Sequence, residues 1–478
     1  MITRDRLLIG GEWTAPRGDG SGTLDVVDPA TDRVVGRVPV ASAADVDAAV
    51  RAAAAAFPSW SQVPMGERVA LVERIRAGVE ERREELAALL TLQMGTPITF
   101  ARQAQLGVAL ADLDEIVKAG RDHTAEEVVG GALVVREPAG VVAAITPWNF
   151  PLHQIALKVG AALVAGCTVV LKPSELTPLD AYVFAEIVQA AGAPAGVFNL
   201  VPGDGPVTGE ALVAHPLVDV VTLTGSVRAG ARVAELAAPT IKKVTLELGG
   251  KSAGIVLDDA DLASVVPQAV GGCFANAGQI CAALTRLLVP AHLLEEVERL
   301  AAEAATGWVP GPPSDPATRL GPQASRRQQR IVQDHIRAGI AEGARLIAGG
   351  AESAEPAGPG AYVSPTIFSD VRPEMTIARE EIFGPVLSIM SYGTEDEAVA
   401  IANDSDYGLS GGVWSADPAR ALAVARRLRT GMVSVNGAGL NVAAPFGGYK
   451  RSGVGRECGR YGIEEFLEIK TVVGVPTA

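Results

Sequence analysis

The chain has 478 residues, of which 48% are hydrophobic and 20% charged, and its formal net charge is −14. At ~150 residues per domain, this length predicts about three domains, or one large α/β unit with appendages. The composition is that of a globular protein and excludes the disordered and fibrous classes. Because the chain is acidic and has no basic stripe, nucleic acid is excluded as an expected partner.

Cysteine usage and hydropathy indicate the expected cellular location of the protein. The longest apolar stretch, Val159 to Leu171, lies between two lysines and is shorter than the ~20 residues that cross a bilayer, so no membrane contact is expected. No CxxC spacing occurs, and no export signal follows Met1. We therefore expect a reducing, cytoplasmic location, where each cysteine is first interpreted as a small buried hydrophobe. The four are Cys167, Cys273, Cys281 and Cys458.

The predicted elements begin with a helix from about Ser42 to Pro58. Further along, short β-branched runs alternate with helical stretches, a pattern that predicts a parallel, doubly wound sheet. Its five strands are predicted at Val141–Ile145, Cys167–Leu171, Val197–Val201, Val218–Leu223 and Lys243–Glu247. Ligands of such sheets bind beyond the carboxyl ends of the strands, and polar and glycine-rich residues follow each of the five.

A second α/β domain is predicted after Gly250. It begins with a strand at Ala253–Leu257 and a helix opened by Asp261. Later strands are expected near Leu287, Ile367, Leu387, Gly412 and Met432. The fold class is therefore α/β, with a Rossmann-like first domain and a second α/β domain.

Several segments of the sequence match standard nucleotide-binding or hydrolase motifs only in part. Gly203 to Gly209 spaces its glycines one residue too widely for the dinucleotide fingerprint, and Gly225 to Gly230 alone is weak evidence for a diphosphate site. Two GxSxG windows, at Gly250–Gly254 and Gly408–Gly412, lack the strand–turn–helix context of a serine nucleophile. Because no clustered His and Cys spacing occurs, we expect no metal site.

Cys281 differs from the other cysteines because it follows a helical segment in the glycine-marked loop Gly278-Gln-Ile-Cys281. A nucleophilic cysteine also needs a lowered pKa or a nearby base. Glu247, at the end of a strand before a Gly-Gly turn, is a candidate base, although a capping role is equally compatible with this position.

Taken in order, these residues resemble the NAD(P)-dependent aldehyde dehydrogenase superfamily over nearly the whole chain. The resemblance rests on Thr146-Pro-Trp-Asn-Phe-Pro151, Lys172-Pro-Ser-Glu175, Thr224-Gly-Ser226 with Gly230, Glu247-Leu-Gly-Gly-Lys-Ser252, Gly278-Gln-Ile-Cys281 and Glu380-Glu-Ile-Phe-Gly-Pro-Val386. It implies that Cys281 attacks the aldehyde and that the Asn149 amide and the Cys281 backbone N–H stabilise the oxyanion. After hydride transfer, water activated by Glu247 hydrolyses the thioester.

The resemblance also implies the cofactor site. Lys172 and Glu175 are expected at the adenosine ribose, Ser226 and the Gly225 turn at the diphosphate, and Glu381 with Phe383 at the nicotinamide end. The full predicted set is Ile145, Thr146, Trp148, Lys172, Glu175, Gly205, Gly209, Thr224, Gly225, Ser226, Leu248, Glu381 and Phe383. A carboxylate at Glu175 accepts hydrogen bonds from ribose hydroxyls and repels a 2′-phosphate, which favours NAD, with NADP as the alternative.

Six residues are expected by alignment to line the substrate entrance: Phe150, His153, Gln154, Leu157, Ile280 and Phe446. His153 has a second interpretation as a helix-surface histidine, and we favour that one. The absence of a cationic cluster around this entrance disfavours strongly anionic substrates.

The family pattern implies three structural units and an oligomer. An NAD-binding domain is expected from residues 1–120 and 138–249, a catalytic domain from 250–450, and a bridging element from 121–137 and 451–478. In that element, strands at Gly131–Arg136 and Lys470–Val475 are expected to pair subunits into a homodimer or homotetramer.

Two other functions stay open at this point. One is a CoA-acylating semialdehyde dehydrogenase, in which CoA replaces water, and Glu247 argues for water. The other is a non-redox (thio)esterase built on Cys281 and Glu247, which the complete set of cofactor motifs disfavours.

Overall fold

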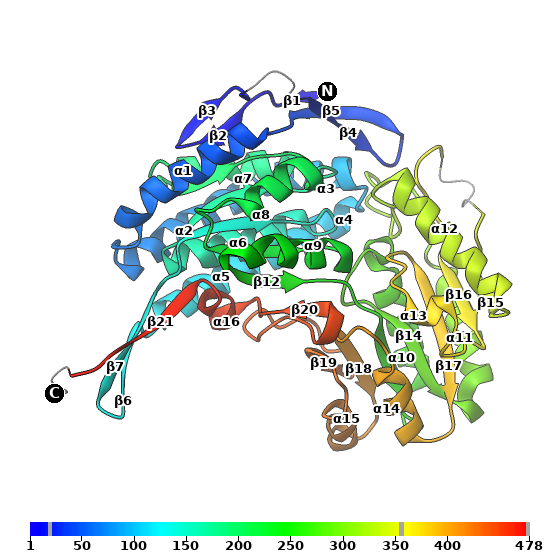
Figure 1. Ribbon diagram of the computed structural model, residues 1–478. Coiled ribbons are helices and arrows are strands. Elements are labelled where there is room, and N and C mark those ends of the chain that lie inside the picture. The colour runs from blue at the N-terminus through cyan, green and yellow to red at the C-terminus, as the bar shows by residue number, and fades with distance from the viewer. Residues whose placement is uncertain (18–21, 353–357, 475–478) are drawn as a thin grey trace.

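The computed structural model describes residues 1–17, 22–352 and 358–474. Two large sheets lie side by side, one in each half of the molecule (Figure 1). The first has the strand order β20-β12-β11-β8-β9-β10-β2-β3. Its strands are β2 (Leu7–Ile9), β3 (Glu12–Thr14), β8 (Val141–Ile145), β9 (Thr168–Lys172), β10 (Phe198–Leu200), β11 (Val220–Thr224), β12 (Lys243–Glu247) and β20 (Gly453–Val454).

The five predicted strands are β8 to β12, and they form the parallel centre of this sheet. Antiparallel β2, β3 and β20 extend its two edges. Alternate residues of β8 enter different cores: Val142 and Ala144 pack on one face of the sheet and Val141 and Ala143 on the other. The doubly wound prediction is therefore confirmed, since both faces are covered.

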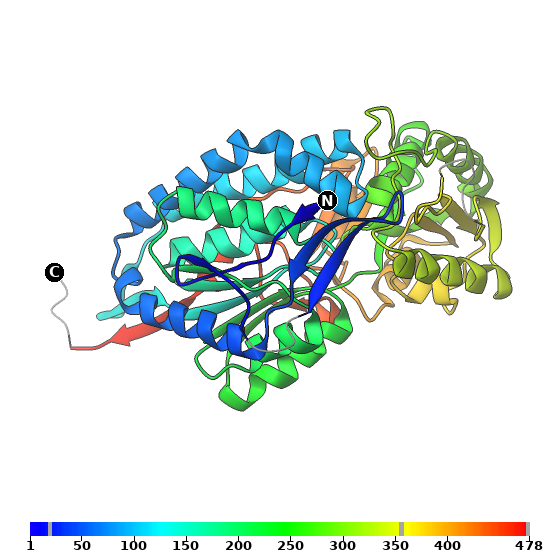
Figure 2. The ribbon, with the colours of Figure 1, turned by 90° about the horizontal axis from the view of Figure 1, so that it is seen from above.

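Helices form these two layers, which Figure 2 shows from above. The face of Val142 is covered by α2 (Met65–Glu81), α3 (Arg83–Met94), α5 (Leu106–Arg121), α6 (Pro151–Ala165) and α7 (Leu179–Ala190). The face of Val141 is covered by α1 (Ala43–Trp60), α8 (Glu210–Ala214) and α9 (Val227–Ala237). Helix α1 runs two residues past Pro58, where the sequence pattern had predicted its end.

The second sheet has the order β15-β16-β17-β14-β13-β18-β19, parallel except for the β15–β16 pair. Its strands are β13 (Ser252–Val256), β14 (Leu284–Pro290), β15 (Arg345–Ala348), β16 (Thr366–Ser369), β17 (Val386–Tyr392), β18 (Ser410–Trp414) and β19 (Met432–Val435). Around it lie α10 (Leu262–Phe274), α11 (Leu294–Ala305), α12 (Arg326–Ala341), α13 (Thr376–Arg379), α14 (Glu395–Asn403) and α15 (Pro418–Ala425). The predicted second set of parallel strands after Gly250 is thus confirmed.

A three-stranded antiparallel sheet projects from the first half of the molecule (Figure 1). It consists of β6 (Glu126–Val129), β7 (Ala132–Pro138) and β21 (Leu467–Val472). Val475, where the second bridging strand was expected to end, lies outside the described residues. Residues 451–466 return to the first sheet, where β20 pairs with β12 and α16 (Gly459–Glu464) packs on α5 and α6.

A small sheet of β1 (Ile2–Thr3), β5 (Arg33–Pro39) and β4 (Thr23–Asp28) lies at the N-terminal side. Within the described residues, no helix is both long and apolar enough to cross a membrane. The division into domains at the predicted boundaries stays a prediction.

Strand register brings polar residues together at one rim of the first sheet. Ile145 lies opposite Lys172 on β9 and opposite Leu223 on β11. Thr224, the last residue of β11, lies opposite Glu247 at the end of β12. Since all four strands run in the same direction, the loops that follow them converge on the space between the two sheets.

Candidate active site

Two cavities meet at this rim. The first has a volume of about 520 Å³ and is lined by α6, by the segment from Phe100 to Ala111 and by residues 440–446. The second, about 290 Å³, lies between the ends of β11 and β12 and the segment around Glu381. Asn149, Thr224 and Cys281 line both cavities. Cys281 is therefore accessible from two sides.

An irregular turn presents Cys281 at this junction. Helix α10 ends at Phe274, and Asn276 and Ala277, two and three residues further on, have φ angles of 52° and 55°, which lie in the left-handed region. Gly278 follows with a φ of +72°, and a Cβ there would stand 2.0 Å from the carbonyl carbon of Gly384. Only glycine fits this position, so the backbone itself fixes where the thiol emerges.

Buried amides hold this turn against the Asn149 loop. The Asn276 amide receives a hydrogen bond from Thr96 Oγ1 (2.9 Å) and donates to the Asn149 carbonyl (3.1 Å). Asn149 Nδ2 donates in return to the Gln279 carbonyl (3.0 Å). The predicted oxyanion donor and the predicted nucleophile are thus parts of one hydrogen-bonded unit. Sequence reasoning had assigned no role to Asn276 or Gln279, although Gln279 belongs to the motif that ends in Cys281.

The surroundings of Cys281 favour the protonated thiol over the thiolate. Burial raises its pKa to about 12, and the nearby Glu381 and Glu247 carboxylates raise it in the same direction. A thiolate is the nucleophilic form, so attack on a carbonyl requires that this proton be removed.

Glu247 lies at the end of β12 and lines the second cavity. Its side chain is buried, and neither carboxylate oxygen has a hydrogen-bond partner among the described residues. Burial raises the pKa of this carboxyl well above its usual range, and the charge of Glu457 raises it further, while Lys158 and Arg456 lower it. A carboxyl with a raised pKa and free oxygens is suited to accept a proton from water.

A buried ion pair stands behind Glu247. Lys158 of α6 contacts the Glu457 carboxylate and donates to Thr222 Oγ1 (3.1 Å), and its side chain is 1% exposed. Sequence reasoning missed both residues. The available signal was Lys158 itself, a single lysine at the start of the longest apolar stretch.

Seven of the predicted cofactor residues line the second cavity: Trp148, Thr224, Gly225, Ser226, Leu248, Glu381 and Phe383. The Trp148 and Phe383 rings meet edge to face with centroids 5.2 Å apart. Ser226 caps the N-terminus of α9 by accepting from the Ala229 N–H (3.2 Å). Glu381 is half-buried and accepts from the Gly250 N–H (3.1 Å), and desolvation of its carboxyl raises its pKa to about 7. Gln328 and Ile331 of α12 also line this cavity and were not predicted.

The other six predicted cofactor residues lie along the same rim, outside the second cavity: Ile145, Thr146, Lys172, Glu175, Gly205 and Gly209. Lys172 is buried and donates from Nζ to the Gly203 carbonyl (2.7 Å), and its Nζ is 4.0 Å from Glu175 Oε2. A Cβ at Gly209 would lie 3.6 Å from the Lys172 stem. Thr146 Oγ1 is buried and has no partner among the described residues.

The six predicted substrate residues, Phe150, His153, Gln154, Leu157, Ile280 and Phe446, all line the first cavity. The favoured interpretation of His153 as a helix-surface residue is wrong. Its side chain is 12% exposed and contacts the buried Asp112, with Nδ1 and Oδ2 2.5 Å apart. The helical pattern of α6 did not reveal this, because α5 covers that side of the helix.

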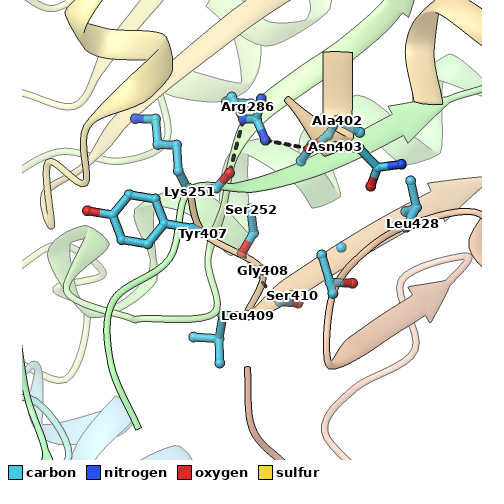
Figure 3. Close-up of a pocket in the computed structure, with 13 residues that line it drawn as sticks. Lys251, Ser252, Arg286, Ala402, Asn403, Tyr407, Gly408, Leu409, Ser410 and Leu428 are labelled. Carbon is cyan, nitrogen blue, oxygen red and sulfur yellow. Dashed lines mark hydrogen bonds between the residues drawn. The ribbon is translucent and has the colours of Figure 1, made fainter. Parts of the chain in front are cut away.

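Arg286 links the strand that follows Cys281, β14, to the backbone just before β13, the strand that follows the Glu247 turn. It lies on β14 and donates from Nε to the Lys251 carbonyl (3.0 Å), just before β13 (Figure 3). Its terminal nitrogens donate to the carbonyls of Ile401 and Ala402 in α14 (3.0 Å each). The neighbouring Lys251 amine is buried without a partner among the described residues, and burial lowers its pKa to about 7.

A cysteine at the junction of two cavities, at the rim of a doubly wound sheet, is the arrangement expected of an α/β enzyme that uses a thiol nucleophile. The model of the aldehyde dehydrogenase family matches residues 13–472. The chain therefore belongs to the aldehyde dehydrogenase family, as its motifs had indicated, and it is an aldehyde dehydrogenase.

Individual relatives cover the chain almost end to end. It is 51% identical over 467 residues to 3-succinoylsemialdehyde-pyridine dehydrogenase from Pseudomonas sp, covering 98% of each chain. A mutant of aldehyde dehydrogenase C from Pseudomonas syringae, solved with NAD+ and octanal, is similar with a TM-score of 0.98 and 50% identity, covering 99% of this chain and 97% of that one. An E. coli enzyme described as NADP dependent has a TM-score of 0.93 and 36% identity, with 98% of each chain covered.

Proposed function

We propose that this protein oxidises an aldehyde to the carboxylic acid with NAD, through a covalent thioester on Cys281. The observation that carries the proposal is the position of Cys281 and Asn149, which line both cavities at their junction. An aldehyde that enters from the first cavity and a cofactor that enters from the second would meet at this thiol.

The residues of the rim and the second cavity fit a dinucleotide. Ser226 caps α9 at the end of a helix that favours phosphate. The buried Thr146 hydroxyl lacks a partner within the described residues, and the Trp148 and Phe383 rings form an aromatic wall. When bound there, NAD accepts the hydride that leaves the substrate carbon. Glu175 lies beside Lys172 at the rim, and its negative charge favours NAD over NADP.

Cys281, Asn149 and Glu247 each have a separate role. Once the Cys281 thiol has lost its proton to solvent water, the sulfur attacks the aldehyde carbon, and the C=O bond opens to an oxyanion. The Asn149 amide uses one N–H to bond the Gln279 carbonyl, which holds the amide in place so that the other N–H can stabilise the oxyanion. The oxyanion collapses as hydride leaves, and a thioester remains. Water then adds to the thioester carbonyl while Glu247 takes its proton, and the C–S bond breaks to release the acid.

Retention of Glu247 also separates hydrolysis from transfer to CoA. Both its oxygens are free of protein hydrogen bonds within the described residues, so they can take a proton from water.

The four cysteines are free, which agrees with a reducing, cytoplasmic location.

We infer in addition that the projecting sheet pairs subunits into a homodimer or homotetramer. Val128, Val129, Ile469 and Val473 on or next to this sheet are exposed by 55–76%. An exposed β-edge with apolar side chains needs a partner. Light scattering should give two or four times the chain mass of 49.2 kDa, and a monomer at micromolar concentration would contradict this inference.

The test of the proposed function uses two variants and a matched control. With an aldehyde panel and NAD, Cys281→Ala should form no reduced nicotinamide. Glu247→Gln should give a burst of at most one equivalent per site, because the thioester forms and is not hydrolysed. Cys167→Ala, at a buried cysteine remote from both cavities, should keep steady turnover. Steady turnover by Glu247→Gln at the parent rate would rule out its role as base, and absence of any reduced cofactor with the parent protein would rule out the function.

A further inference from the structure

Asp112 and His153 form an ion pair in the wall of the first cavity. Asp112 lies on α5 with its side chain fully buried, and His153 lies on α6 and lines the cavity. Their atoms Oδ2 and Nδ1 are 2.5 Å apart, while Asp112 Oδ1 has no partner among the described residues. The contact fixes the imidazole ring by its Nδ1, and within the described residues its Nε2 makes no hydrogen bond to the protein.

The rest of this cavity is mostly apolar. Its described lining includes no lysine, arginine, aspartate or glutamate, so His153 is the one residue of the described lining that can carry a positive charge. Of the polar residues, Gln103 is exposed to solvent, Gln154 accepts from Thr224 Oγ1 (2.8 Å), and Asn149 belongs to the proposed reaction centre. An apolar pocket with one oriented polar group is the usual form of a specificity site for a small ligand.

The number of protons on the Asp112–His153 pair decides whether His153 Nε2 is a hydrogen-bond donor or an acceptor. With one proton between Asp112 Oδ2 and His153 Nδ1 and a second on the ring, Nε2 carries a hydrogen, whichever of the two atoms holds the shared proton. When the pair loses a proton, the remaining one stays between Oδ2 and Nδ1, and Nε2 becomes a lone-pair acceptor. The pair therefore donates a hydrogen bond only in its protonated form.

We propose that the Asp112–His153 pair selects aldehydes that carry a neutral hydrogen-bond acceptor, a ketone oxygen or an aromatic ring nitrogen, at a distance from the aldehyde carbon. The inference rests on the proposed function, since it names the substrate class of the same site. The pair has no net charge when protonated, so it favours a neutral acceptor over a carboxylate. An unbranched alkyl aldehyde enters the same cavity without using this donor.

The local charges set the pH range in which the donor exists. Burial alone would lower the pKa of His153, but the facing Asp112 carboxylate more than offsets burial and raises it, and Glu457 acts in the same direction. Lys158, on the same helix, opposes them. Because the folded pKa is raised, the Nε2–H donor is present at and below the usual titration range of histidine. It is lost as pH rises through the raised pKa.

The experiment compares kcat/KM for octanal with kcat/KM for octanals in which the CH2 at C4, C5 or C6 is replaced by C=O, and compares 3-phenylpropanal with 3-(pyridin-3-yl)propanal. The ratio within each matched pair cancels the titration of the catalytic groups that both substrates share. In the parent protein, at least one acceptor-bearing member should be preferred. His153→Leu should reduce that preference about tenfold or more, the size of a hydrogen bond to a charged group.

Three comparisons separate this role from a structural one. His153→Gln retains a donor and should keep part of the preference without its pH dependence. Asp112→Asn removes the carboxylate and should move the loss of preference to lower pH. Gln103→Leu removes another polar side chain of the same cavity and should leave the ratio unchanged.

Ratios that are the same in the parent and His153→Leu at every pH would overturn the proposal while octanal is still oxidised. A parent preference that does not decline with rising pH would overturn it without any variant. Failure of the parent to oxidise any of these aldehydes with NAD is a separate result, which rules out the proposed function.

Discussion

Replacing Gly278 by alanine should displace the catalytic thiol. Gly278 has a φ of +72°, and an added Cβ would lie 2.0 Å from the carbonyl carbon and 2.1 Å from the carbonyl oxygen of Gly384, which is backbone and cannot rotate away. The left-handed conformation costs an alanine about 1–2 kcal/mol. Relief of the overlap by backbone shifts costs about 1–3 kcal/mol more. The free energy of unfolding should therefore fall by roughly 2–5 kcal/mol.

Activity should fall further than stability predicts, because Cys281 is three residues away. A displacement of about 1 Å at a reacting atom costs on the order of 100-fold in rate, so kcat/KM of the folded variant should fall by about that factor. Urea unfolding measures the first effect, and initial rates of nicotinamide reduction with a fixed aldehyde measure the second.

Gly272→Ala is the matched control. Gly272 lies in α10 without a positive φ, and a Cβ there would meet nothing within 4 Å. Alanine in a helix is favoured over glycine by up to about 1 kcal/mol, so this variant should be as stable as the parent or more stable, with parent activity. If Gly278→Ala matches Gly272→Ala in both stability and kcat/KM, the turn does not position the thiol and the reasoning is refuted.

Three further predictions concern the titrating groups and the cofactor. Thioester hydrolysis, measured in single turnovers, should speed up as pH rises through the raised pKa of Glu247. Glu457→Gln removes a charge that raises this pKa, so the increase in rate should occur at lower pH. An increase at the same pH in the variant and the parent would contradict the coupling between the two carboxylates. The raised pKa of Cys281, about 12 against an ordinary 9.0, leaves far less thiolate at pH 8 than a free thiol has. The greater nucleophilicity of the thiolate recovers only part of this difference, so iodoacetamide should label Cys281 in nucleotide-free protein about tenfold or more slower than a free thiol. Labelling as fast as the free thiol would refute the raised pKa of Cys281. Glu175→Ala should raise kcat/KM with NADP relative to NAD, whereas Glu235→Ala, at an exposed side chain of α9, should not. Equal NADP-to-NAD ratios in the two variants would show that Glu175 does not affect cofactor choice.

Local sequence patterns were sufficient for the sheet and for the residues at its rim. The β-branched runs of β8 to β12 are buried on both faces, so their hydrophobicity marks them directly, and the polar residue at the end of each strand follows. Position along the chain thus predicted Asn149, Lys172, Thr224 and Glu247 at one rim. The strand register brings the ends of β8, β9, β11 and β12 together.

Pairs that form across the tertiary structure were not predicted. Asp112 and His153 are 41 positions apart, and Lys158 and Glu457 are 299 apart. Each of these residues alone is an ordinary polar or charged residue in a helix or loop. Its structural role depends on a partner in a different element, which the local sequence does not reveal. Burying one of these charged side chains without its partner would cost several kcal/mol. The residues are therefore buried only because the fold brings each partner into contact.

Backbone strain gathers where the two cavities meet. Of the nine non-glycine residues with positive φ among those described, Asn276 and Ala277 lie in the turn before Cys281, Phe383 lines the second cavity and Cys458 lines the first. Each such conformation costs of order 1 kcal/mol or more and persists only where its surroundings over-determine it. Here the amides of Asn276, Asn149 and Gln279 supply those surroundings. The hydrogen bonds that hold the strained turn also hold Asn149, the proposed oxyanion donor, so the fold places the proposed nucleophile and its stabiliser together before any substrate binds.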